Sequence, residues 1–120
     1  RAGYGIAKLR AEQAELQLEA AEQDLVLAVD EALRSVARDR AGLEVANQIL
    51  EHASASLEAQ QDLLREGRGS TRDVVDALEA LRGAEAAKLR AEIACQQSLN
   101  RAERVAGRLL SDGLPDPRAR

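Results

Sequence analysis

The most restrictive feature of this sequence is an unbroken series of large aliphatic residues at every seventh position. The series comprises Val29, Val36, Leu43, Leu50, Leu57 and Leu64, and Ala32, Ala46 and Ala53 each follow a member by three residues. A seven-residue repeat with this 3-4 spacing lies along one side of an α-helix, and small side chains there let a second helix approach closely. We therefore expect the six aliphatic residues to form a helix-packing seam.

The composition favours long helices over a compact core. Phe, Trp and Met are absent, Tyr4 is the only aromatic residue, and apolar residues make up 45% of the chain. Helices rich in Ala and Leu pack through small side chains rather than around large rings. No apolar run approaches the roughly 20 residues that a membrane-spanning helix needs, and no signal-peptide pattern is present. Because the chain starts at Arg1 and contains no Met, we expect it to be a piece of a longer polypeptide.

One internal stretch, residues 65–71, has the composition of a turn. It contains Gly67 and Gly69 followed by Ser70 and Thr71, and a small polar residue after glycines is typical of a reversal followed by a helix N-cap. Pro115 and Pro117 stand beyond the last apolar residues of helical spacing. The sequence thus predicts an all-α fold, a long antiparallel helical hairpin of coiled-coil type. Its expected parts are a short leading segment 1–5, a first helix 6–66, a turn 67–70, a second helix 71–110 and a mobile tail 111–120.

The second helix is expected to pack through one apolar stripe that drifts slowly around it. The stripe contains Val74, Leu78, Leu81, Ala84, Leu89, Ile93, Leu99, Ala102, Ala106 and Leu110. The first helix carries apolar residues on more than one face and is longer than its partner. Two helices alone would leave much of this surface in water, so we expect further neighbours.

The titratable residues indicate no enzymatic chemistry. The 17 basic and 21 acidic residues are scattered, so the chain lacks the clustered basic excess of a nucleic-acid-binding surface. His52 has no second His or Cys at metal-ligand spacing and is expected to face solvent, while Cys95 is expected to be a small buried residue. No phosphate loop and no nucleophile paired with a base is present. We predict no enzymatic activity, no cofactor, no metal site and no nucleic-acid partner.

The turn and the start of the second helix resemble the hairpin-turn signature of TolC-like outer membrane efflux proteins. That signature reads approximately as a basic residue, an aromatic residue, two variable positions, Gly, two more, a small polar residue, two more, and Asp-Val-Leu-Asp-Ala. Gly67 and Ser70 match it, and Asp73-Val74-Val75-Asp76-Ala77 closes it. Leu64 stands where an aromatic residue is common, and Val75 where Leu is common.

Both ends of the chain extend this resemblance over about residues 3–110. Gly3-Tyr4-Gly5 is similar to the glycine-marked start of the long descending helix in these proteins. Ala106-Gly107-Arg108-Leu109 resembles the close of the ascending helix. This close, followed by a Pro-rich end, looks more like the C-terminal of the two related halves of such a chain.

The resemblance implies a passive exit duct for efflux or type I secretion. Such a duct is a homotrimer in the cell outer membrane, and its periplasmic part is a trimeric α-helical barrel of hairpins like this one. It would be held in the membrane by segments outside this sequence and would work with a periplasmic adaptor and an inner-membrane pump. The expected adaptor contacts at the hairpin end are Gly67, Arg68, Gly69, Ser70, Arg72 and Asp73. Without the resemblance, a plain connection between helices is the default interpretation of this turn.

Between positions 12 and 31 the sequence has seven acidic residues and no basic one: Glu12, Glu15, Glu19, Glu22, Asp24, Asp30 and Glu31. The simpler interpretation is a solvated helix face. The alternative is the lining of a water-filled duct, where fixed negative charge favours cations. The spacing leaves both open.

Two other functions remain possible from the sequence. A periplasmic adaptor of the membrane-fusion type also uses a long antiparallel helix pair, but such adaptors usually carry an Arg-Leu-Ser type of tip, which is missing here. A coiled-coil scaffold without a transport role would need only the helical periodicity.

Overall fold

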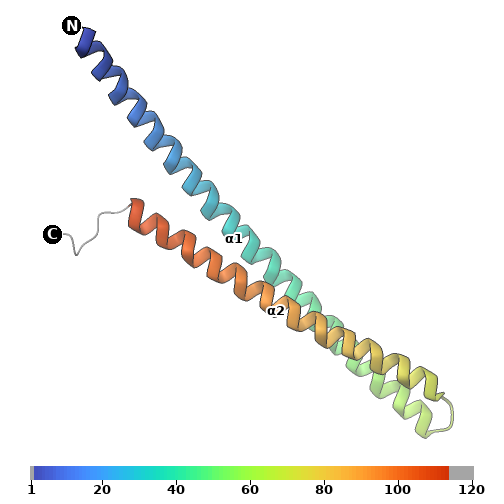
Figure 1. Cartoon of the computed structure of the whole chain (residues 1–120). Helices are drawn as coiled ribbons and strands as arrows, with labels where there is room; N and C mark the ends of the chain where they lie inside the picture. The colour runs from blue at the N-terminus through green and yellow to red at the C-terminus, as the bar shows by residue number, and fades with distance from the viewer. Residues whose placement is uncertain (1, 114–120) are drawn as a thin grey trace. The chain divides into compact units, whose positions relative to one another are not determined.

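A computed structural model describes residues 2–113 of the chain, and they form two long helices joined by a short turn (Figure 1). Helix α1 spans Ala2–Arg65 and helix α2 spans Thr71–Gly113. No strand occurs among the described residues. The predicted all-helical hairpin is therefore confirmed as a fold, whereas a trimeric barrel is an assembly that one chain leaves untested.

The helices begin and end at somewhat different residues than expected. Helix α1 begins at Ala2, so most of the expected leading segment 1–5 is already helical. Gly3 and Gly5 weaken a helix by only about 1 kcal/mol each relative to Ala, which the helix formers around them tolerate. Helix α2 continues past Leu110 to Gly113, just short of Pro115, a residue that a helix interior excludes. The expectation of a mobile tail concerns mainly residues 114–120, which lie outside the described residues.

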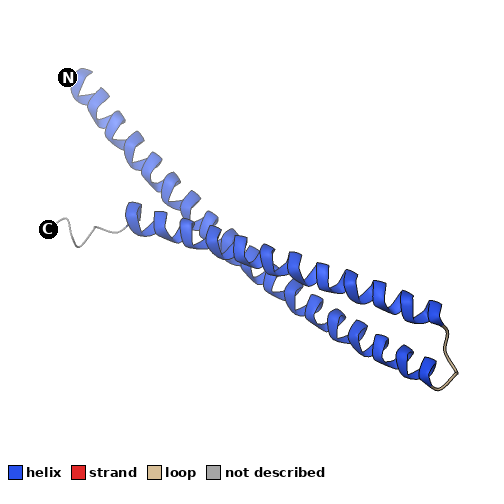
Figure 2. Ribbon diagram, turned by 60° about the horizontal axis from the view of Figure 1, so that its bottom comes forward, coloured by secondary structure: helices blue, strands red, loops and turns tan. Residues whose placement is uncertain are grey.

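The chain divides into two units, each of which contains parts of both helices. Unit 1 comprises Arg1–Arg34 with Asn100–Arg120, and unit 2 comprises Ser35–Leu99. In unit 2, α1 and α2 run antiparallel and side by side away from the turn, as both Figure 1 and Figure 2 show. The turn and the sequence-predicted contact residues all belong to unit 2.

The interior of unit 2 is a seam with an unbroken 3-4 spacing on both helices. Its buried or half-buried positions are Val36, Asp39, Leu43, Ala46, Leu50, Ala53, Leu57 and Gln60 on α1, and Val74, Ala77, Leu81, Ala84, Lys88, Ala91, Cys95 and Ser98 on α2. The most buried apolar residues of this set are all small: Ala46, Ala53, Ala77, Ala84 and Cys95. Small side chains bring the two helix backbones close together.

The structure places most of the predicted α1 series along this seam. Val36, Leu43, Leu50 and Leu57 are half-buried in unit 2, and Leu64 beside the turn is 38% exposed. In unit 1, Val29 is half-buried and Ala32 is buried.

The predicted stripe on α2 is wrong at several positions. Leu78, Leu89 and Ile93 are exposed, while Ala77, Cys95 and Ser98 take the interior positions. The prediction followed the large aliphatic residues, but a seam this narrow selects for side-chain size before hydrophobicity. Leu78, Leu89 and Ile93 consequently point away from α1, while Val74 and Leu81 stay half-buried in the seam.

In unit 1, few side chains are buried from solvent. Every described residue of α1 from position 3 to position 24 is exposed, including Ile6, Leu9 and Leu16. On the α2 part of this unit, Ala102, Val105 and Leu109 are half-buried and continue the 3-4 spacing.

Candidate functional site at the hairpin turn

The C-terminal end of α1 is closed by a Schellman motif centred on Gly67. Its φ angle of 75° is the only positive one among the described residues. The Arg68 amide donates to the Leu63 carbonyl at 2.8 Å, and the Gly67 amide donates to the Leu64 carbonyl at 3.0 Å. These bonds satisfy carbonyls that the helix end would otherwise leave unpaired, and glycine adopts the left-handed conformation without steric cost.

Gly69 serves a different purpose, because the turn folds back closely onto α1 at this residue. A Cβ atom at Gly69 would lie 3.0 Å from the Leu64 backbone nitrogen and 3.1 Å from the Leu63 Cβ. The Gly69 amide donates to the Leu63 carbonyl at 3.0 Å. Gly69 has no positive φ, since Gly67 takes that conformation, and Gly69 instead provides close approach within the chain itself.

The N-terminal end of α2 is capped by Ser70. The Asp73 amide donates to the Ser70 Oγ at 3.1 Å, the geometry of an N-cap hydroxyl bonded to the third residue of the helix. The Asp73 carboxylate lies in the first turn, where the helix dipole favours negative charge. Gly67, Gly69, Ser70 and Asp73 thus all have local structural roles.

The arginines remain available to a partner. Arg68 pairs with Glu66 at 3.3 Å, but its side chain is 72% exposed, and exposed ion pairs contribute little to stability. Arg72 is also exposed, and no hydrogen bond or ion pair joins it to another residue in the described part of the chain. Among the six predicted contact residues, Arg68 and Arg72 are those whose side chains the turn itself does not need.

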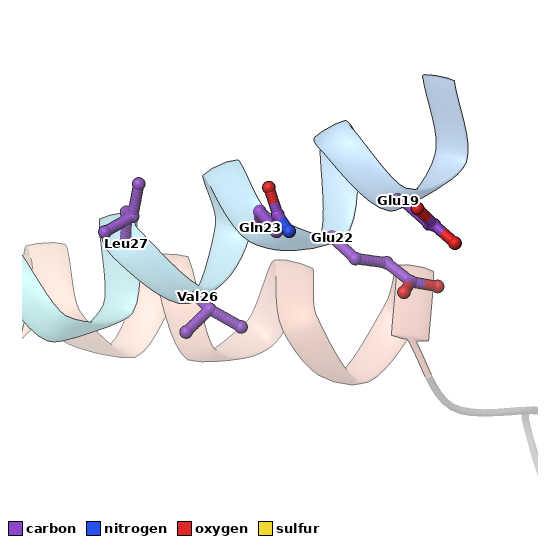
Figure 3. A pocket seen from close by; sticks show the side chains of 5 residues that line it. All are labelled: Glu19, Glu22, Gln23, Val26 and Leu27. Carbon is purple, nitrogen blue, oxygen red and sulfur yellow. The ribbon is translucent and has the colours of Figure 1, made fainter. Parts of the chain in front are cut away.

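The acidic segment of α1 lies in unit 1, and its seven acidic side chains are all exposed. A shallow, open hollow on this segment is lined by Glu19, Glu22, Gln23, Val26 and Leu27. Figure 3 shows Glu22 and Val26 on one side of the helix, and Gln23 and Leu27 on another. Asp30 pairs with Arg34 at 3.1 Å. This arrangement encloses no ligand-sized space, and it fits a solvated face and a duct lining equally well.

The remaining candidates occupy the environments that the sequence predicted. His52 is exposed and Cys95 is a buried free cysteine. Within residues 2–113, no three side chains of the His, Cys, Asp and Glu types gather as they would around a metal ion. The helices of this described part also lack any stretch apolar and long enough to cross a bilayer.

The prediction from sequence missed one polar cluster inside the seam. The Ser98 hydroxyl donates to the Asp39 carboxylate, and the Ser35 and Ser98 hydroxyl oxygens lie 3.4 Å apart. The sequence did indicate that Asp39 belongs to the seam, since it stands between Ala32 and Ala46 at the same seven-residue spacing. That position was passed over because it is not apolar.

Comparison with known proteins gives one match. The model of a protein family described as outer membrane efflux protein matches residues 1–108. Neither the curated proteins nor the solved structures contain a significant match.

Proposed function

Because the chain belongs to the outer membrane efflux protein family, we propose that it forms part of a trimeric exit duct that carries cargo passively across the periplasm and the outer membrane. The family is one of channel and transport proteins rather than enzymes. Its match favours the duct over the adaptor and scaffold hypotheses. The hairpin described above would form part of the periplasmic wall of the duct.

The observation that carries this proposal is the exposure of several large apolar residues that lie outside the seam of unit 2. Val45 and Ile49 on α1, and Leu89 and Ile93 on α2, are between 50% and 58% exposed. Each fully buried side chain of this kind contributes about 1.5–3 kcal/mol, so their burial by neighbouring hairpins would stabilise an assembly substantially. A barrel of several hairpins provides such neighbours on both sides, whereas an isolated coiled coil would leave these residues in water.

At the hairpin end, Arg68 and Arg72 would contact the periplasmic adaptor. Both side chains are exposed and make none of the backbone hydrogen bonds of the turn, and arginine forms strong charge-assisted bonds to carboxylates and carbonyls. The rigid closure of the turn by Gly67, Gly69 and Ser70 would present these side chains at defined positions. In this mechanism, adaptor contact at the end of a stiff hairpin shifts packed helices and widens a constriction, while the partner pump supplies the energy.

A charge reversal of the two arginines tests the adaptor contact. In the complete protein, Arg68→Glu with Arg72→Glu is expected to reduce efflux and adaptor crosslinking at least about tenfold, because two charged hydrogen bonds are lost and replaced by repulsion. The trimer yield should stay normal, since neither side chain has a role in the fold of the hairpin. Arg82→Glu is the matched control, because Arg82 is also exposed on α2 but lies away from the turn. Normal crosslinking in the double variant would contradict a contact role for the turn.

A further inference from the structure

The seam of unit 2 contains one place where polar side chains of both helices meet. Ser98 on α2 is 2% exposed and is the most buried polar residue of the described chain. Its neighbours across the seam are Asp39 and Ser35, which lie one helical turn apart on α1. Lys88 is also at a seam position, but its ammonium group reaches Glu92 on its own helix at 3.9 Å. The Ser35–Asp39–Ser98 cluster therefore connects the two helices, whereas the contact of Lys88 stays within α2.

The protons of this cluster have a single consistent arrangement. Ser98 has one hydroxyl proton, which it donates to the Asp39 carboxylate. The 3.4 Å contact between the two serine hydroxyls must then use the proton of Ser35, with the Ser98 oxygen as acceptor. A chain of two hydrogen bonds thus runs from Ser35 through Ser98 to Asp39, and it requires all three residues to face each other at one level of the hairpin.

Apolar packing alone gives no reason for this arrangement. Alanine occupies the corresponding interior positions elsewhere in the seam, at Ala46, Ala53, Ala77 and Ala84. Serine in place of alanine adds a hydroxyl that must find a partner, and an aspartate in a helix seam loses hydration, which destabilises the fold unless a hydrogen bond compensates. Polar residues at interior positions of coiled coils are known instead to restrict how the helices can be aligned.

The distance of the cluster from the turn shows which part of the hairpin it could align. Asp39 lies 26 residues before the end of α1 and Ser98 lies 27 residues after the start of α2. At 1.5 Å per residue, both are about 40 Å from the turn. The Schellman motif and the serine cap fix the alignment of the helices at the turn, but the seam beyond it is rich in alanine. Small side chains interlock weakly, so they resist sliding and separation less than large ones do.

We infer that the Ser35–Asp39–Ser98 cluster is a second alignment point, which holds α1 and α2 in one fixed relation at the end of unit 2 far from the turn. With the turn at one end and the cluster at the other, unit 2 behaves as one stiff body. This inference concerns the hairpin itself and does not depend on the proposed transport role.

The variant Ser98→Ala tests this inference sharply, because two accounts predict opposite results. If packing alone holds the helices, the substitution extends the alanine seam and leaves the pairing unchanged or tighter. If the cluster aligns the helices, it removes the central hydroxyl of the hydrogen-bond chain and leaves Asp39 without its partner. Amide hydrogen exchange of the complete, assembled protein distinguishes them, because it reports local opening segment by segment.

We expect Ser98→Ala to speed exchange roughly tenfold in residues 36–46 and 91–99, and to leave residues 57–81 around the turn unchanged. Ser56→Ala is the matched control, since Ser56 is half-buried on α1 nearer to the turn and, within the described residues, no hydrogen bond links it to α2. Asp39→Asn retains a carbonyl oxygen for Ser98 and should stay within about twofold of the parent.

Three results would overturn the inference. The first is unchanged or slower exchange in Ser98→Ala. The second is an equal acceleration at both ends of unit 2, which would make the cluster a contributor to general stability only. The third is an acceleration of amide exchange in Asp39→Asn as large as that in Ser98→Ala. If Ser98→Ala fails to assemble, Ser35→Ala removes only the outer hydroxyl and is judged by the same exchange pattern.

Discussion

The two glycines of the turn illustrate how residues of one type can serve different physical needs. Gly67 has open space around the position of a Cβ but a φ angle of 75°, whereas Gly69 has no positive φ but a Cβ position crowded by Leu63 and Leu64. The sequence predicted a turn at these residues because glycine and serine cluster there. It could not assign the roles, because those depend on φ angles and on the approach of the chain to itself.

A comparison of asparagine substitutions separates these two roles. Asparagine tolerates the left-handed conformation, so Gly67→Asn should destabilise the turn by less than about 1 kcal/mol, and Gly67→Ala by about 1–2 kcal/mol. At Gly69, any side chain meets backbone atoms, so Gly69→Asn and Gly69→Ala should both cost about 1–3 kcal/mol. Amide exchange of residues 62–70 measures these costs. If Gly69→Asn proved as mild as Gly67→Asn, the crowding at Gly69 would not be a constraint.

This crowding also limits what a bulky residue at Gly69 could reveal about a partner. Leucine there would collide with the last turn of α1 before it could obstruct an adaptor. The exposed arginines Arg68 and Arg72 are the better positions for such tests, because their side chains can be changed without disturbing the hydrogen bonds of the turn.

At the scale of the helices, small residues decide which faces meet. The seven-residue series on α1 is visible in the sequence because its aliphatic members coincide with seam positions. On α2 the same reasoning selected Leu89 and Ile93, which are exposed, and passed over Ser98, which is buried. Hydrophobicity identifies a face that avoids water, but the spacing between two helix backbones determines which side chains fit there. Asp39 was missed for the same reason.

Enlarging one seam alanine should therefore be more harmful than enlarging its exposed neighbour. Ala84 is 5% exposed and Ala80, one turn earlier on α2, is exposed. Ala84→Leu should destabilise the hairpin by about 1–3 kcal/mol through overpacking, while Ala80→Leu should change its stability by less than about 0.5 kcal/mol. Thermal or denaturant unfolding of the complete protein measures both. Equal effects would show that the seam is loose enough to accept large side chains at any position.

At the scale of the whole molecule, the dominant property is the large number of apolar side chains exposed to solvent. Sixteen large hydrophobic residues are exposed among the described ones, and they occur in both units. A surface of this kind marks contacts with other chains or with other parts of the same polypeptide. The same property explains why two helices with favourable local sequence would still depend on neighbours.

The 120-residue chain on its own should consequently be a poor monomer. At micromolar concentration we expect it either to self-associate or to lose part of its helix content, because exposed aliphatic residues of α1 such as Ile6, Leu9 and Leu16 are left uncovered by the described part of the chain. Sedimentation velocity measures self-association, and circular dichroism measures helix content. A fully helical, stable monomer would show that the hairpin needs no neighbours.

The claim that this hairpin belongs to a trimeric exit duct is tested most directly by the mass of the complete protein purified from the outer-membrane fraction of its cells. Native mass spectrometry of that material should give three copies of the polypeptide, because closed rotational symmetry supplies each hairpin with neighbours on both sides. A single copy in that fraction, or a protein found only in other fractions, would contradict the account.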